Sequence, residues 1–218
     1  MLVFLMMNVL NYIDMIGPLV AIVTFIFSRK KITNELGLVL AFCVVQFICN
    51  IIASALSTYY IPNYAVYKIN TVASLIILLL LFSRHLLQFN KKMNYLVYAF
   101  IILVIIPTFF GEGITSYNSY SATLSSFIIV AFCLYYFSIK LLRSNPEESV
   151  PATAIFWCVV GIFIYYAGSF FIFLSYKYLI ETDIKSIGAL WKFHNLLLFI
   201  ACISISYGVL CKDYRPTS

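Results

Sequence analysis

Amides, hydroxyls and charged side chains recur at regular spacing in a chain that is otherwise strongly apolar. The stretch 190–199, LWKFHNLLLF, places a lysine, a histidine and an asparagine within four positions of an apolar run. The stretch 46–57 carries polar side chains at steps of four, four and three, which is the spacing of one helix face. Such side chains are costly inside lipid, so each is expected to face a partner or a water-filled cavity.

These polar groups predict one ligand pocket in the outer half of the membrane. Asp14, just before Gly17-Pro18, is the one carboxylate that we place within a span and away from its ends. Its expected ion-pair partners are Lys68 and Lys192, and the alternative for an unpaired carboxylate at this depth is that it is protonated. The predicted ligand-binding residues are Asp14, Gln46, Asn50, Ser54, Lys68, Asn70, Trp191, Lys192, His194 and Asn195.

A structural role is the alternative for each of these side chains. A lysine near a helix end can extend to the membrane surface, and asparagine and glutamine often join membrane helices by hydrogen bonds. A single histidine is more often satisfied by its neighbours than a ligand. Gly161 and Gly168 favour close helix packing. The clustering of the polar residues in one half favours a pocket over separate packing contacts.

The chain offers no constellation for catalysis or metal binding. Its two histidines, His85 and His194, are expected at opposite ends of the bundle, and no cysteines or carboxylates stand at metal-ligand spacing. No P-loop, glycine-rich nucleotide fingerprint or intramembrane-protease motif occurs. We therefore predict a protein that is not an enzyme and has no metal or cofactor.

Composition places these residues in an integral membrane protein of one domain, residues 1–218. Of the 218 residues, 63% are hydrophobic and 10% charged, and the mean hydropathy is +1.00. A water-soluble fold carries about 25% charged residues. The apolar runs are unbroken rather than alternating, which predicts helices and not a barrel. The six cysteines are interpreted as small buried hydrophobes, not as a disulfide framework.

Seven transmembrane helices are predicted, each near the ~20 residues that a bilayer requires. Pro107 is expected to end or kink the fourth. The predicted spans are 9–28, 36–60, 65–88, 94–110, 120–142, 152–177 and 187–210.

The basic residues predict the orientation. Ten of the fourteen Lys and Arg fall in one set of loops and four on the opposite side. The positive-inside rule places the ten in the cytoplasm, so the N-terminus is outside and the C-terminus inside. The basic residues are scattered over short segments, which argues against a nucleic-acid partner.

Two segments of the second and third predicted helices match two segments of the sixth and seventh. FCVVQFICNIIAS (42–54) resembles WCVVGIFIYYAGS (157–169), and YKINT (67–71) resembles WKFHN (191–195). A parallel repeat of two three-helix units joined by the fourth helix would explain both matches, and chance similarity of apolar helices is the alternative. This 3+1+3 layout is similar to that of the sugar-efflux and PQ-loop transporters. Their Pro-Gln signature is absent, since Leu19 follows Pro18.

The last two predicted helices resemble those of seven-helix bacterial membrane modules, which occur alone or ahead of sensor kinases. The resemblance rests on ATAIFWCVVGIFIYYAGSFFIFL (152–174), on LWKFHNLLLFIACISISYGVL (190–210) and on the Trp-x-x-His-Asn start of the latter. It implies a receptor-like sensing module in the bacterial cytoplasmic (inner) membrane. Because no kinase follows, its output would need a separate protein partner.

The favoured function is therefore a receptor-like sensor or accessory membrane subunit that binds a small molecule from the outside. A small solute carrier of 3+1+3 architecture and a scaffold without a ligand are the alternatives. The expected partners are the lipid bilayer, the small-molecule ligand, a cytoplasmic or membrane protein, and a second copy of the chain.

Overall fold

The helices coincide with the apolar runs of the sequence. The computed structural model describes residues 12–28, 32–86, 91–111, 116–142, 153–182 and 184–211. Within these residues the regular structure is entirely helical, which confirms the all-α prediction. The elements are α2 (Ile13–Phe27), α3 (Asn34–Thr58), α4 (Tyr64–Leu86), α5 (Lys91–Ile106), the π-helical turn η1 (Pro107–Gly111), α6 (Ser119–Leu142), α7 (Ala154–Thr182) and α8 (Ile184–Leu210).

Each predicted span overlaps one helix. The span predicted from residue 9 begins outside the described residues, and its helix starts at Ile13. α3 begins before the predicted residue 36 because the Thr33 hydroxyl accepts a hydrogen bond from the Leu36 N–H, at 3.3 Å, and caps the helix. Pro107 ends α5, as predicted, and the chain continues as η1.

The lengths and composition of the helices suit a lipid environment. Among the described residues, the helices α3, α4, α6, α7 and α8 are long and apolar enough to cross a membrane, with hydropathies of 1.8 to 2.5 over their most apolar windows. α2 and the segment Val97–Gly111 are apolar but shorter. The chain therefore has the build of a multi-pass helical membrane protein.

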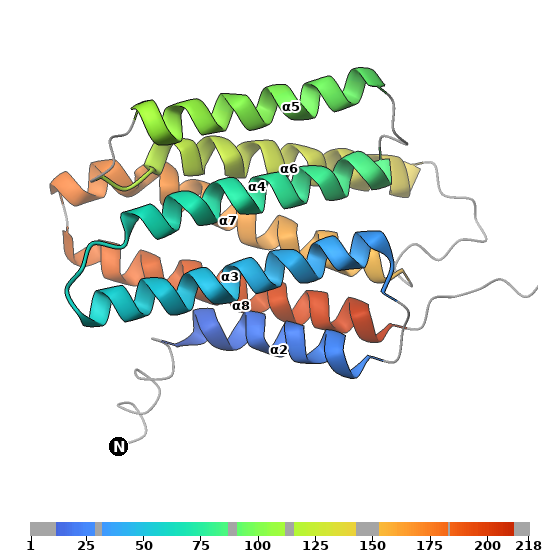
Figure 1. Cartoon of the computed structure of the whole chain (residues 1–218), viewed down its shortest axis with the longest axis horizontal. Coiled ribbons are helices and arrows are strands. Elements are labelled where there is room, and N and C mark those ends of the chain that lie inside the picture. Colours follow the sequence, from blue (N-terminus) through green and yellow to red (C-terminus); the bar gives the residue numbers. More distant parts are fainter. Residues whose placement is uncertain are drawn as a thin grey trace, which may run out of the picture.

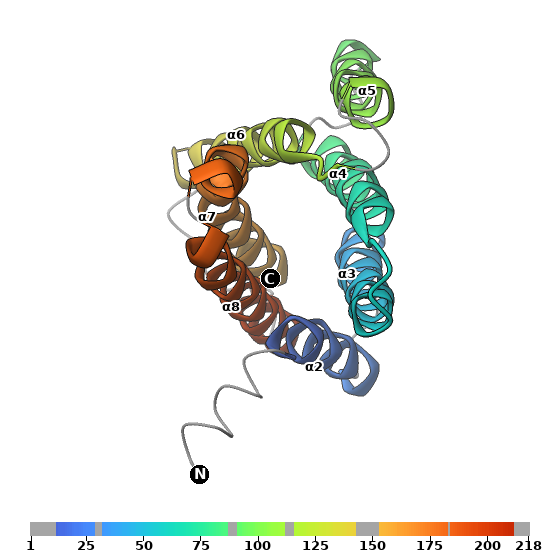
Figure 2. The ribbon, with the colours of Figure 1, turned by 90° about the vertical axis from the view of Figure 1, so that its left-hand side faces the viewer.

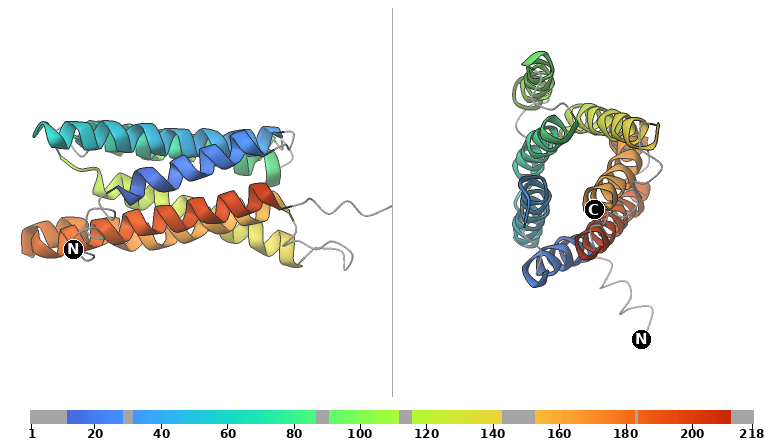
Figure 3. Two further views of the ribbon diagram at one scale, coloured as in Figure 1. Left: turned by 90° about the horizontal axis from the view of Figure 1, so that it is seen from below. Right: turned by 90° about the vertical axis from the view of Figure 1, so that its right-hand side faces the viewer.

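The helices α2, α3, α4, α6, α7 and α8 form a closed ring in that order, and α5 lies outside it (Figure 2). Each ring helix contacts both of its neighbours, and α5 packs against α4 and α6. The view from the opposite end shows the same order (Figure 3). We call the end of the ring where α3 joins α4 the 59–63 end; α2, α4, α6 and α8 all begin there (Figure 1).

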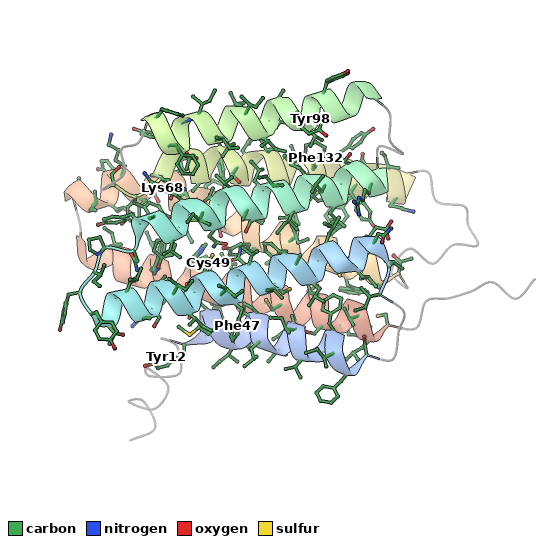
Figure 4. The ribbon with its side chains drawn as sticks, viewed as in Figure 1. Tyr12, Phe47, Cys49, Lys68, Tyr98 and Phe132 are labelled. Carbon is green, nitrogen blue, oxygen red and sulfur yellow. The ribbon has the colours of Figure 1, made fainter. Side chains whose placement is uncertain are left out.

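Apolar side chains fill the half of the ring that lies away from the 59–63 end. Phe42 stands early in α3, whereas Phe82 and Tyr136 stand late in helices that run the other way, so all three fall in this half. Phe82 also stacks on Phe132, with ring centroids 5.7 Å apart (Phe132 is labelled in Figure 4). The largest fully buried side chains include Phe25, Phe42, Leu78, Phe82, Ile129, Tyr136, Ile162 and Ile205.

Glycines bring the backbones of α7 and α8 into close contact. A Cβ atom on Gly161 would lie 2.6 Å from the Ala201 carbonyl oxygen, and one on Gly208 would lie 2.6 Å from the Ala154 carbonyl oxygen. The Ser204 hydroxyl donates a 2.8 Å hydrogen bond to the Trp157 carbonyl across the same interface. Small residues and interhelical hydrogen bonds are the usual basis of membrane helix packing.

The contact at Gly161 yields a prediction about stability. Gly161→Ala should lower the free energy of unfolding by about 1–3 kcal/mol, because the added methyl group meets a backbone atom that cannot rotate away. Gly188→Ala is the matched control, since a Cβ there has nothing within 4 Å. That variant should be as stable as the wild type or slightly more stable. Thermal unfolding of the detergent-purified variants measures both, and equal midpoints would contradict the packing argument.

Candidate functional site

Two adjoining cavities lie in the half of the ring near the 59–63 end. The inner cavity has a volume of about 40 Å³, which suits one or a few water molecules. Its walls come from every ring helix and from Tyr117, which precedes α6. The outer cavity, which we call the vestibule, has a volume of about 380 Å³ and is walled by α2, α3, Asn63, Tyr67 and α8. That volume falls in the range of small-molecule sites.

The boundary between the two cavities is formed by residues that line both. They come from α2, α3, α4 and α8, so the boundary crosses the ring from one side to the other. We call this set the partition. It consists of Asp14, Asn50, Tyr67, Trp191 and Asn195.

The structure brings together nearly all of the residues predicted from sequence. Ser54 and Lys192 line the vestibule, and Lys68 is the exception because it lines neither cavity. Lys68 is 4% exposed and lies on α4 near the 59–63 end (Figure 4). The residues of the predicted set that line the inner cavity are Asp14, Gln46, Asn50, Asn70, Trp191, His194 and Asn195.

Side chains of α3 and α4 form a closed cycle of hydrogen bonds on the wall of the inner cavity. Gln46 Nε2 donates to Ser74 Oγ at 2.9 Å, and Ser74 Oγ donates to Asn70 Oδ1 at 3.2 Å. Asn70 Nδ2 then donates back to Gln46 Oε1 at 3.1 Å. Because each group is both donor and acceptor, the cycle fixes the amide orientations and joins the two helices.

Asn50 compensates for the proline inside α2. Pro18 has no N–H, so the carbonyl of Asp14, four residues earlier, lacks its helical donor. Asn50 Nδ2 donates a 2.8 Å hydrogen bond to that Asp14 carbonyl oxygen. The amide of α3 therefore completes the backbone bonding of α2 and fixes the turn that carries the Asp14 side chain.

His194 is held by protein groups on both sides of its ring. Its Nδ1 lies 2.9 Å from Ser169 Oγ and its Nε2 lies 3.2 Å from Tyr165 OH. The ring also stacks on Trp191, with centroids 5.1 Å apart and planes at 22°. Both nitrogens of His194 therefore lie within hydrogen-bond distance of hydroxyl groups of α7, and its ring packs on Trp191 at the inner cavity.

Trp191 is the centre of a cluster of aromatic rings. It meets Tyr67 and Tyr117 edge to face, with centroids 5.6 Å apart in each case. Tyr176 lies at 6.1 Å from Trp191 and at 4.5 Å from Tyr117. The rings of Tyr67, Tyr117 and Trp191 thus form an aromatic wall at the inner cavity.

The Asp14 carboxylate pairs with no side chain within the part of the chain that the structure describes. Its hydrogen-bond donors are the backbone N–H groups of Asp14 and Met15, and its buried Oδ1 atom accepts no hydrogen bond from the described residues. The expected ion pair with Lys68 or Lys192 is not formed, and that prediction is wrong for the described residues. Lys192 instead is exposed at the vestibule. Asp14 is therefore a partly buried carboxylate that lines both cavities and has one acceptor atom without a donor among the described residues.

Sequence reasoning missed several lining residues. Tyr67 is one of them: an aromatic residue near a helix end is typical of the membrane surface, yet this one belongs to the partition. The serines of α6 and the tyrosine pair of α7 carried no signal of their own, because their role depends on which helices close the ring. The missed residues at the inner cavity are Tyr67, Thr71, Ser74, Tyr117, Ser125, Ser126, Tyr165 and Tyr166.

Comparison with protein-family models, curated proteins and solved structures finds no match for this chain. The resemblances to sensor modules and to 3+1+3 transporters therefore stay predictions. Within the described residues, no group of three or more His, Cys, Asp or Glu side chains could hold a metal ion. The two cavities and their lining residues are therefore the basis of the proposed function.

The bond between Asn50 and the Asp14 carbonyl predicts a coupling between Asn50 and Pro18. Asn50→Ala should lower the free energy of unfolding by about 1–3 kcal/mol, because a buried carbonyl loses its donor. In a Pro18→Ala background the N–H of residue 18 can donate to the Asp14 carbonyl. Asn50→Ala should then lower the free energy of unfolding by at least about 1 kcal/mol less than it does in the wild type. Thermal unfolding of the wild type, the two single variants and the double variant gives this difference.

Asn63→Ala is the control for that cycle. Asn63 Nδ2 also donates to a backbone carbonyl, that of Ala53 at 3.2 Å, but this carbonyl is unrelated to Pro18. Asn63→Ala should lower the free energy of unfolding by the same amount with Pro18 and in the Pro18→Ala background. If the loss caused by Asn50→Ala is also the same with Pro18 and in the Pro18→Ala background, the Asn50 amide does not substitute for the N–H that Pro18 lacks.

Proposed function

We propose that this chain is a receptor-like membrane protein that binds a small polar molecule from the outside, in the vestibule and against the partition. The observation that carries the proposal is the asymmetry of the ring. One half holds two polar cavities and a carboxylate that pairs with no side chain of the described residues, and the other half is filled with apolar side chains. A site that is open at one end only is what a receptor requires.

The proposal includes seven membrane spans with the N-terminus outside. The described helices supply five long spans and two shorter apolar segments. The basic residues lie mostly in the loops opposite the 59–63 end, and the positive-inside rule assigns those loops to the cytoplasm. The vestibule then faces the outside, and a signal would reach a protein partner through the cytoplasmic loops.

A small solute carrier is the second candidate, and the order of the ring favours it. The segments that match in sequence lie on α3 and α7 and on α4 and α8. Each pair is separated by half of the ring, as two parallel three-helix units would require (Figure 2). A carrier would also need a route through the apolar half, which is closed in this structure by side chains such as Phe42 and Phe82.

The orientation predicts where cysteines can be labelled. Ser57 is an exposed residue of the vestibule, and Cys211 is partly exposed beyond the opposite end of the ring, where α8 ends. A membrane-impermeant maleimide added to intact cells should label Ser57→Cys, whereas Cys211 should be labelled only after permeabilisation. The wild type serves as the control, because Cys43, Cys49, Cys133, Cys158 and Cys202 are buried. The reverse pattern would overturn the orientation.

The site itself is tested by a thermal-stability screen of soluble compounds. A compound present at 100 times its dissociation constant should stabilise the protein by about 2.7 kcal/mol. Ser54→Trp should abolish that stabilisation by filling the vestibule, whereas Ile52→Trp, at an exposed position of the same helix, should preserve it. Equal binding by both variants would overturn the vestibule as the site. Flux of the bound compound across liposomes would identify a carrier instead of a receptor.

A further inference from the structure

The partition combines aromatic rings with a carboxylate that pairs with no side chain of the described residues, and this combination selects a chemical class of ligand. We infer that the ligand carries a protonated amine, which binds the Asp14 carboxylate beside the rings of Tyr67 and Trp191. The inference rests on the proposed function and deepens it, because a receptor pocket could equally be selective for neutral or acidic compounds.

The charge of the site comes from Asp14. A partly buried carboxylate with one oxygen lacking a donor is unfavourable, and an ammonium group would provide both a hydrogen-bond donor and the opposite charge. Within the described residues no lysine supplies that charge, since neither Lys68 nor Lys192 pairs with Asp14. The Asn50 hydrogen bond to the Asp14 backbone holds the carboxylate in place before a ligand arrives. The Oδ1 acceptor is therefore preorganised and has no donor among the described residues.

The aromatic rings add a second attraction for a cation. Tyr67 and Trp191 belong to the partition together with Asp14, and their ring planes are at 89° to each other. The face of a tryptophan or tyrosine ring attracts an ammonium group within about 6 Å. Trp191 is held in its orientation by the His194 ring, which stacks on it, and by the Tyr117 ring, which lies perpendicular to it. A neutral ligand would gain neither the ionic nor the cation–π contribution.

The sizes of the two cavities orient the ligand. The inner cavity, at about 40 Å³, admits water but no organic group of the size of a phenyl ring. The vestibule, at about 380 Å³, can hold the body of a small amine. The ammonium group thus lies at the partition and the rest of the molecule in the vestibule. The exposed Lys192 at the vestibule disfavours a second positive charge there.

Three probes of similar shape and different charge test the inference. They are 2-phenylethylamine, 2-phenylethanol and 3-phenylpropionate, each titrated against the purified full-length protein while its unfolding temperature is followed. The amine should raise the unfolding temperature in a saturable manner, and the alcohol and the acid should not. In Asp14→Asn the affinity for the amine should fall about tenfold or more, because a charged hydrogen bond is lost.

Glu35→Gln is the matched control for Asp14→Asn. It makes the same change from carboxylate to amide, but Glu35 lies in the first turn of α3, at the end of the ring opposite the vestibule. The amine should bind Glu35→Gln with wild-type affinity. Trp191→Leu should also lower the affinity for the amine. Comparison with Asp14→Asn then separates the aromatic contribution to binding from the ionic one.

Three results would overturn the inference. They are equal shifts by amine, alcohol and acid, undiminished amine binding in Asp14→Asn, and no response to the amine at millimolar concentration. A different outcome would overturn this inference alone and leave the proposed function standing. If the alcohol or the acid binds and Ser54→Trp abolishes that binding, the pocket is a receptor site and only the selectivity for amines is wrong.

Discussion

The interior of a bilayer holds no water to satisfy polar groups, and most of the polar half of this ring is organised by that constraint. Gln46, Asn70 and Ser74 satisfy one another in a cycle. Asn50 serves a carbonyl that a proline has left without a donor, and His194 has a hydroxyl group at each nitrogen. Against this background of paired groups, the buried Oδ1 atoms of Asp14 and Asn118 have no donor among the described residues, and of these two residues only Asp14 lines the cavities.

The same contacts make the site rigid. The polar cycle joins α3 to α4, the Asn50 amide joins α3 to α2, and the His194 contacts join α8 to α7. Gly161 and Gly208 hold α7 and α8 at backbone contact, and Gly17 lets α2 approach Phe199 of α8. The residues of the partition are therefore carried by helices that are fixed to one another around most of the ring. A rigid frame of this kind lowers the entropic cost of binding a small molecule.

Much of the fold could be predicted from the sequence, because long apolar runs leave few alternatives to membrane helices. The polar residues of α3 and those at the start of α8 also indicated the region where the two cavities lie, since polar groups in lipid converge on shared partners. What could not be predicted was the partner of each group. The pairing of Asp14 with a lysine seemed the natural expectation from charge alone, yet the structure leaves the carboxylate open. The role of Asn50 depends on a carbonyl without a helical donor, four residues before Pro18 on another helix. The place of Tyr67 at the inner cavity depends on which helices close the ring.

The position of α5 outside the ring follows from the directions in which the neighbouring helices run. α4 and α6 are ring neighbours that run in the same direction, so a chain that leaves α4 at one end must cross the bundle once before it can begin α6 (Figure 1). α5 makes that crossing while touching the ring on one side only, and its other side stays exposed, with Tyr95 at 74% and Tyr98 at 60% exposure. Because α5 only returns the chain to the other end of the bundle, it does not have to pack between two neighbours as the ring helices do. Its sequence can therefore drift, or adapt to a neighbouring protein in the membrane, without disturbing the two cavities.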